Sequence, residues 1–121
     1  RQPAGPGPGR VGIRARPVNF SVRYTTGARD DLVRLFQFLL DRARTVEDLD
    51  RADRALDAIT SAIDHHLRRF PFACRKVGES PFLRELVIAF GHSGYVALFE
   101  IDDATTVTIL AVRHQREDDY H

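Results

Sequence analysis

The sequence predicts an α+β domain in which a helical hairpin packs on one face of an antiparallel sheet. Two long segments carry apolar residues at three- and four-residue steps, which indicates two consecutive helices. Three runs rich in β-branched and aromatic residues follow from residue 83 onward, and their short polar connections are typical of antiparallel hairpins. A short alternating segment precedes the helices, so the expected order is β-α-α-β-β-β.

The first strand is expected at 20–24, where FSVRY alternates apolar and polar residues. Thr26 is placed to cap the first helix, and Asp30 and Asp31 favour its dipole. This helix is expected to end near Arg42. Its apolar stripe consists of Leu32, Leu35, Phe36, Leu39 and Leu40.

The second helix is expected to begin after Thr45, because Thr45-Val46-Glu47-Asp48 resembles a capping box with Asp48 in place of the usual Glu. It should run to about Arg69, and Pro71 ends it. We expect its stripe to face that of the first helix and to close the hairpin. The stripe consists of Leu49, Ala52, Leu56, Ile59, Ile63 and Leu67.

The three later strands are LRELVIAF, YVALFEI and VTILAVRH, joined at 91–94 and 102–105. In the last of them, strict alternation places His114 on one face and Arg113 on the other. By the same rule His114 should share its face with Leu110 and Val112.

Composition indicates one domain, at 19–121, after a Pro/Gly/Arg-rich tail at 1–18 that we expect to be disordered. A nucleic-acid contact by this basic tail is an alternative. The whole chain carries a net charge of only +1, so it is not a general polyanion binder.

Cofactor chemistry has little support in the sequence. Cys74 is the only cysteine, which excludes an intrachain disulfide and fits the reducing cytoplasm. His65 and His66 are adjacent and no histidine pair has i, i+4 spacing, so we expect neither a metal nor another cofactor. Apolar runs are too short to span a membrane, and we recognise no secretory signal.

The polar cluster at 113–121 follows an almost wholly apolar strand. Histidine as acid or base, arginine on a phosphate and tyrosine as donor could together serve RNA cleavage. The alternative is a solvated tail after a final strand, and residue spacing alone favours this alternative.

The stretch from Leu83 to His121 resembles the C-terminal half of the RelE/ParE toxins of type II toxin–antitoxin systems. The resemblance covers about 20–121 but is specific only from Leu83 on. The matching features, in order, are Arg84-Glu85, Ser93-Gly94-Tyr95, an apolar strand ending in Arg113-His114, and the closing Arg116 and Tyr120. The β-α-α-β-β-β order is also the family's order.

The family has two branches: RelE-like members are similar to ribosome-dependent mRNA endonucleases, and ParE-like members inhibit DNA gyrase. The RelE pattern implies an arginine where this chain has Val96, two lysines where it has Val87 and Ala89, and a late arginine where it has His114. These cations would stabilise the negative charge of a phosphorane-like transition state, so their absence should greatly slow cleavage. The resemblance therefore implies a ParE-like gyrase inhibitor. Cleavage of mRNA on the ribosome and a non-toxic antitoxin-binding regulatory subunit are the alternatives.

The resemblance also implies the site residues and partners. Target-binding candidates are Arg84, Arg113, His114, Arg116 and Tyr120; in the endonuclease alternative the catalytic set is His114, Arg116, Tyr120 and Arg84. An acidic, amphipathic antitoxin segment is expected to cover the apolar sheet face that the hairpin leaves open, with DNA contacted only through the antitoxin. Antitoxin-binding candidates are Arg34, Arg42, Tyr95, Leu98, Arg113 and Arg116.

Overall fold

The computed structural model describes residues 19–115, so the tail expected at 1–18 and residues 116–121 lie outside the described part of the chain. The elements, in order, are β1 (Ser21–Tyr24), α1 (Thr26–Arg42), α2 (Val46–Leu67), a 3-10 helix (Pro71–Ala73), β2 (Arg75–Lys76), β3 (Leu83–Phe90), β4 (Ser93–Ile101) and β5 (Thr106–His114). This arrangement confirms the predicted α+β class, with the short 3-10 helix and β2 as additions. None of the described helices is long and apolar enough to cross a membrane.

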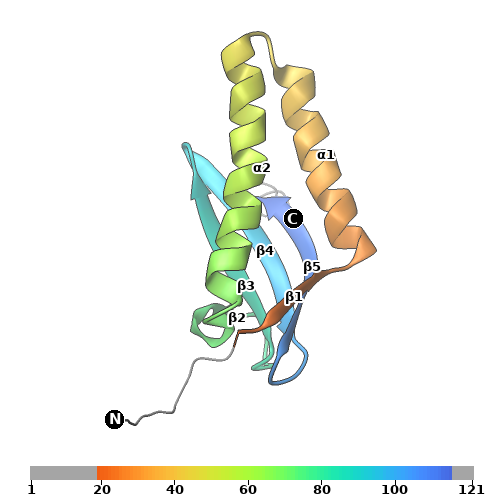
Figure 1. Ribbon diagram of the computed structural model, residues 1–121, viewed down its shortest axis with the longest axis vertical. Coiled ribbons are helices and arrows are strands. Elements are labelled where there is room, and N and C mark those ends of the chain that lie inside the picture. The colour runs from red at the N-terminus through yellow and green to blue at the C-terminus, as the bar shows by residue number, and fades with distance from the viewer. Residues whose placement is uncertain (1–18, 116–121) are drawn as a thin grey trace, which may run out of the picture.

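The five strands form one sheet in the order β1-β5-β4-β3-β2 (Figure 1). β3, β4 and β5 are antiparallel neighbours, as predicted. β1 instead pairs in parallel with β5, from Ser21 opposite Thr106 to Tyr24 opposite Ile109. The sheet is therefore mixed, and the expectation of a wholly antiparallel sheet is wrong at this edge. Only a tight turn forces antiparallel pairing, and the whole hairpin and three strands separate β1 from β5.

Both helices begin at threonine caps. Thr25, one residue before the predicted Thr26, accepts a hydrogen bond from the Ala28 N–H at its Oγ1 (3.0 Å). In α2 the Thr45 Oγ1 accepts from the Asp48 N–H, and the Asp48 carboxylate accepts from the Arg44 N–H, which confirms the predicted cap. These hydrogen bonds hold the pKa of Asp48 below its usual value.

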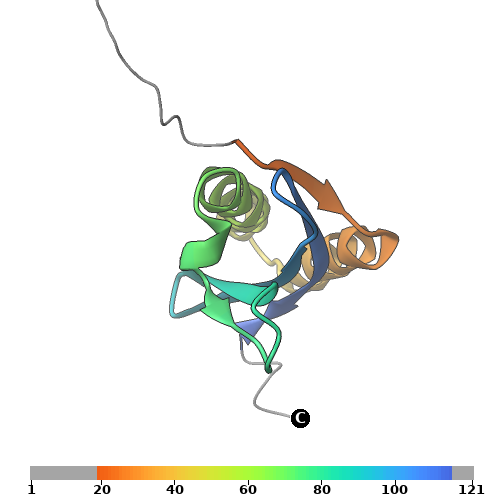
Figure 2. The same cartoon turned by 90° about the horizontal axis from the view of Figure 1, so that it is seen from below.

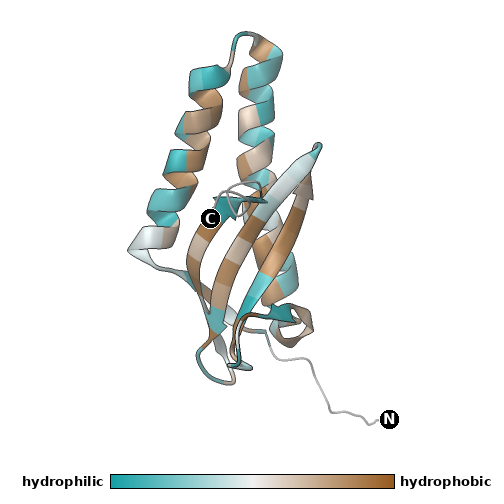
Figure 3. Ribbon diagram, turned by 180° about the vertical axis from the view of Figure 1, so that it is seen from behind, coloured by the Kyte–Doolittle hydropathy of each residue, from teal (hydrophilic) through white to brown (hydrophobic). Residues whose placement is uncertain are grey.

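The hairpin covers one face of the sheet and leaves the other without a helix, as Figures 2 and 3 show. Leu35, Ile59 and Ile63 from the hairpin pack with Phe99 and Ile109 of the sheet in a single core. Figure 1 shows the hairpin tip extending past the end of the sheet. Some stripe residues near that tip lie beyond the sheet, so Leu40 is 36% and Leu49 46% exposed.

A β-bulge changes the alternation of β5. Leu98 pairs with Ala111 but the next residue of β4, Phe99, pairs with Ile109, which leaves Leu110 without a partner on β4. After the bulge, each side chain of β5 lies on the opposite face, relative to Ile109, from the one that strict alternation predicts. His114 therefore lies on the helix-covered face with Val112, as predicted, and also with Ile109, whereas the bulge takes Leu110 out of the predicted alternation.

Candidate functional site

The end of β5 presents two basic side chains to opposite faces of the sheet. His114 lies opposite Tyr95 on the helix-covered face, and Arg113 lies opposite Val96 on the open face. The His114 Nε2 is 3.0 Å from the Ser93 Oγ, and the His114 and Tyr95 rings meet edge to face with centroids 5.3 Å apart. Tyr95 is only 4% exposed, so its ring belongs to the core. Burial raises the pKa of its phenol.

The Ser93-Gly94-Tyr95 motif has a local structural reason. A Cβ on Gly94 would lie 2.2 Å from the Ile88 carbonyl oxygen on β3, so only glycine fits there. The preceding turn needs Gly91 as well, because its φ is +63°. The two glycines permit the tight turn and the close pairing of β3 with β4, and this backbone path brings the Ser93 hydroxyl next to His114.

A second group of cations approaches the same end of the molecule from the helices. The Arg51 guanidinium on α2 lies 5.8 Å from the Phe90 ring centroid, beside the turn at Gly91. The Arg42 guanidinium on α1 lies 4.3 Å from the ring centroid of Phe38. Arg42 and Arg51 line one small cavity of about 150 Å³, so basic side chains from both helices and β5 lie near this end.

The open face of the sheet carries little net positive charge among the described residues. Register places Glu85 and Glu100 on this face with Arg23, Arg75 and Arg113. Arg75 is already paired with Glu85 at 2.6 Å. The two carboxylates offset two of the three guanidinium groups, so the net attraction of this face for a phosphate is weak. This part of the sheet therefore lacks the cation cluster that phosphoryl transfer needs.

Arg84 lies on the other face, away from Arg113. Its guanidinium donates to the carbonyl oxygens of Pro81 (2.8 Å), Phe72 (2.9 Å) and Cys74 (2.7 Å). It also lies 5.2 Å from the centroid of the Phe72 ring. These contacts fix the segment between α2 and β3, so the side chain is turned toward its own chain. The sequence offered no sign of this, because carbonyl acceptors depend on backbone path alone.

The other candidates are scattered over the surface. Arg34 is exposed on α1 and bonds Asp31 at 3.0 Å. Leu98 is half-buried on the open face, opposite Glu85 and Ala111. Arg116 and Tyr120 lie outside the described residues. The structure brings His114 and Tyr95 together, and Asp31 links Arg34 to Val112 of the same strand, whereas Arg84 is turned toward the segment before β3.

Sequence reasoning missed a groove of about 620 Å³ between α1, α2 and β1. It is lined by Val22, Tyr24, Arg29, Leu32, Thr60, Ser61, Ile63, Asp64 and Arg68. Its walls mix apolar side chains with the Arg29 guanidinium and the Arg68–Asp64 pair. Burial and the nearby Asp64 carboxylate raise the pKa of Tyr24. The groove depends on how β1 crosses beneath the hairpin, which residue spacing does not reveal.

Within residues 19–115, no three histidine, cysteine or acidic side chains are grouped so that they could hold a metal ion. The His65 and His66 rings stack edge to face on each other at 5.0 Å.

A helical hairpin on one face of a five-stranded mixed sheet, with the strand order found here, defines a RelE/ParE-type α+β domain. The profile of the ParE toxin of type II toxin–antitoxin systems (parDE) matches residues 22–119. The chain belongs to this toxin family.

The chain is also similar to a curated relative and to a solved structure. A curated relative, Toxin RelE3 of Caulobacter vibrioides (strain ATCC 19089 / CIP 103742 / CB 15), is 37% identical over 98 residues, which cover 80% of this chain and 96% of the relative. A solved structure titled "Chromosomal ParDE TA system from P. aeruginosa" superposes with a TM-score of 0.59 at 17% identity. That match covers 78% of this chain and 95% of the other, and it supports the fold.

Proposed function

We propose that this toxin acts by binding and inhibiting DNA gyrase and that a cognate antitoxin neutralises it. The observation that carries the choice of target is the charge of the open sheet face, where Glu85 and Glu100 offset two of its three arginines, Arg23, Arg75 and Arg113. An RNA-cleaving face has to neutralise a developing negative charge, whereas a protein-binding surface has no such requirement. On this proposal the toxin needs a surface that binds gyrase and does not need a catalytic site.

The contact surface we propose is the end of the molecule at which β5 finishes. Arg113 and His114 are placed there by β5, and Arg51 is placed there by α2. Arg116 and Tyr120 follow in sequence and complete the set. Arginine and aromatic side chains are enriched among the residues that dominate protein–protein binding.

We propose that the antitoxin binds at a different place from gyrase, in the groove between α1, α2 and β1. Leu32 and Ile63 in its walls suit the apolar side of an amphipathic segment, and Arg29 suits its acidic side. We expect the chain alone to be poorly soluble or self-associated, and the complex to be tight. Salt weakens the charged contacts most, so the complex should survive 1 M salt, where the Debye length is about 3 Å.

The test combines a cellular and a purified assay. Expression without the antitoxin should give filamentous cells and a DNA-damage response, and the purified chain should inhibit supercoiling by gyrase. Arg113→Ala should weaken that inhibition by at least tenfold, whereas Arg69→Ala, at an exposed residue just after the end of α2, should not. Arrest of translation with gyrase unaffected would refute the gyrase proposal. The absence of any growth arrest would refute both toxin mechanisms.

One observation favours the endonuclease as a second candidate: the Ser93 hydroxyl holds the His114 ring at 3.0 Å, as an acid–base group would require. Ribosome-dependent cleavage would need His114 and Tyr120 for proton transfer. If gyrase is the target, Tyr120→Phe should keep its toxicity because the aromatic ring remains, and His114→Ala should lose about tenfold at most, as a single contact residue would. A thousand-fold loss of mRNA cleavage on ribosomes in both variants, with the fold intact by circular dichroism, would establish the endonuclease instead.

A further inference from the structure

α1 and β5 lie side by side and run in the same direction. Two hydrogen bonds fix this arrangement: the Thr25 Oγ1 donates to the Leu110 carbonyl (3.3 Å), and the Val112 N–H donates to the Asp31 carboxylate (2.9 Å). Between these contacts the helix side advances six residues, about 9 Å, and β5 advances two residues, about 7 Å. A chain that continues in the direction of β5 therefore runs along α1 toward the hairpin tip.

The side of α1 that contacts β5 carries an exposed aromatic ring and a cation nearer the tip. Leu35, Phe38 and Arg42 follow Asp31 on this side at steps of three and four residues. Leu35 is buried, whereas Phe38 is 51% exposed, with the Arg42 guanidinium 4.3 Å from its ring centroid. Arg42 is about 16 Å further along the helix than Asp31, a distance that an extended chain spans in about five residues. Counted from Val112, residues 117–119 are therefore the ones that reach Arg42.

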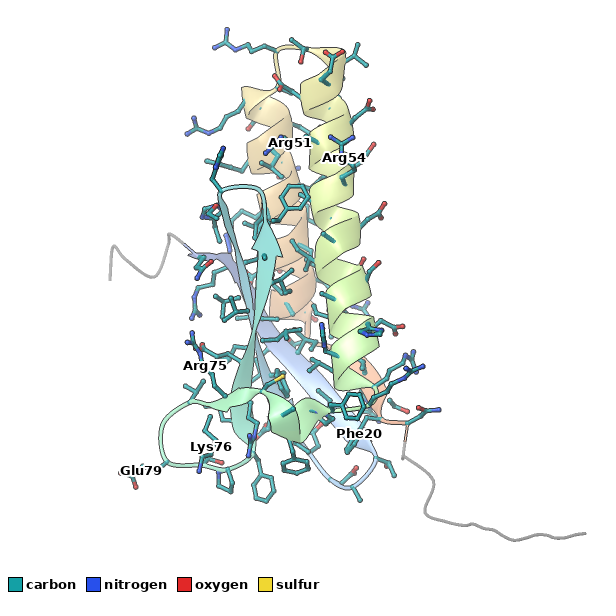
Figure 4. The ribbon with its side chains drawn as sticks, turned by 90° about the vertical axis from the view of Figure 1, so that its left-hand side faces the viewer. Phe20, Arg51, Arg54, Arg75, Lys76 and Glu79 are labelled. Atoms are coloured by element: carbon teal, nitrogen blue, oxygen red, sulfur yellow. The ribbon has the colours of Figure 1, made fainter. Side chains whose placement is uncertain are left out.

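Arg51 brings a second positive charge to this place from α2. Its guanidinium lies beside the turn between β3 and β4, where Figure 4 labels it. Burial raises the pKa of Tyr95, the charge of Arg51 partly offsets that rise, and the Tyr95 ring meets His114 at the end of β5. Arg42 and Arg51 line the same cavity of about 150 Å³ between the helices. Within residues 19–115, neither of these two arginines is in an ion pair.

We infer that residues 117–119, Glu-Asp-Asp, bind in this space with their carboxylates against the guanidinium groups of Arg42 and Arg51. Charge favours this segment, because three successive carboxylates are opposite in sign to the two arginines. Position favours it as well, because β5 ends at His114 while running toward this space. Length is sufficient, because even a chain shortened by the 3-10 turn at Gln115 brings Asp118 or Asp119 to the level of Arg42.

The bound segment covers the exposed side of Phe38 and pairs both arginines. One exposed ion pair contributes little, but several charges in one cluster hold a segment better than an isolated pair does. The neighbouring Arg116 and Tyr120 are then held at a fixed place beside the hairpin. Their use as contacts with gyrase rests on the proposed function, whereas the binding of residues 117–119 to the hairpin does not.

The first test measures the backbone mobility of residues 117–119 by amide NMR relaxation in the full chain, recovered from its antitoxin complex. These amides should be as ordered as those of β5 in the wild type and mobile in the Arg42→Gln/Arg51→Gln double variant. Arg69→Gln is the matched control, because Arg69 is exposed just after the other end of α2, and it should leave the segment ordered. Circular dichroism checks that each variant is folded. A segment that is as mobile in the wild type as in the double variant would overturn the inference.

Cross-linking tests the position of the segment. In a Cys74→Ser background, Asp118→Cys should form an intramolecular disulfide with Ala43→Cys about tenfold faster than with Val33→Cys. Val33 is the matched control, because it is 56% exposed and lies on the opposite side of α1 from Leu35. Equal rates would contradict the assigned place. So would a mobile segment combined with antitoxin-induced shifts at Arg42 and Arg51, because the antitoxin would then occupy the space. Neither measurement involves gyrase, so a failure here leaves the gyrase proposal standing.

Discussion

The carboxylate of Asp31 on α1 accepts a hydrogen bond of 2.9 Å from the backbone N–H of Val112 on β5, 81 residues further along the chain. β1 runs alongside β5 only as far as Ile109. Thr25 continues the contact through its N–H to the Ile109 carbonyl and its Oγ1 to the Leu110 carbonyl. Just past the bulge, the Asp31 carboxylate accepts the hydrogen bond that a neighbouring strand would otherwise accept. This contact connects the start of α1 to the end of β5.

Asp31→Ala should destabilise the domain by about 1–3 kcal/mol, because it leaves the half-buried Val112 N–H without its acceptor. Urea denaturation measures the change. Arg34→Ala removes only the exposed ion pair with Asp31 and should cost less than about 1 kcal/mol. Equal losses in the two variants would show that the contact with β5 contributes nothing.

Ile59→Asp should cost several kcal/mol, enough to unfold a domain of this size, because Ile59 is only 1% exposed and a charge there has no partner. Leu56→Asp should cost less, since that side chain is half-buried. Leu49→Asp, on the same helix but 46% exposed, should stay within about 0.5 kcal/mol. Thermal melting by circular dichroism should rank the variants in that order.

Arg84→Lys should destabilise the chain by about 1.5–3 kcal/mol, because one ammonium group cannot reach three carbonyl oxygens in the geometry of a guanidinium fork. Urea denaturation of the purified variant measures this loss. Any loss of toxicity should then follow the loss of folded protein. A variant that is as stable as the wild type yet no longer inhibits its target would indicate that Arg84 contacts the target, which would contradict a purely structural role.

Stability should fall in alkali. Burial raises the pKa of the Cys74 thiol above its ordinary 9.0 and those of the Tyr24 and Tyr95 phenols above 10.0. An acid whose pKa is raised by folding contributes its stability below the unfolded pKa and loses it as the pH rises through the folded pKa. The urea midpoint should hold to about pH 9 and then decline. Tyr24→Phe should flatten the decline above pH 10, and an unchanged slope would contradict the assigned cause.

Local patterns in the sequence determined the elements and their order. The stripe of α2 and the pairing of Thr45 with Asp48 are contacts within a few residues, so spacing alone reveals them. Runs of β-branched and aromatic residues with short polar connections likewise predicted β3 and β4, and the family motifs from Leu83 on identified the toxin family that the comparisons confirm.

Long-range geometry decided the rest. The parallel pairing of β1 with β5 and the hydrogen bond from Val112 to Asp31 join residues some 80 positions apart, and no local pattern encodes such contacts. The bulge at Leu110 depends on how β5 registers against β4, which residue spacing in β5 alone does not reveal. The bulge alone moved His114 to the helix-covered face, and the fold of the segment before β3 turned Arg84 inward. Sequence determines which side chains a strand carries, but the face on which each lies depends on register, and only the assembled sheet sets register.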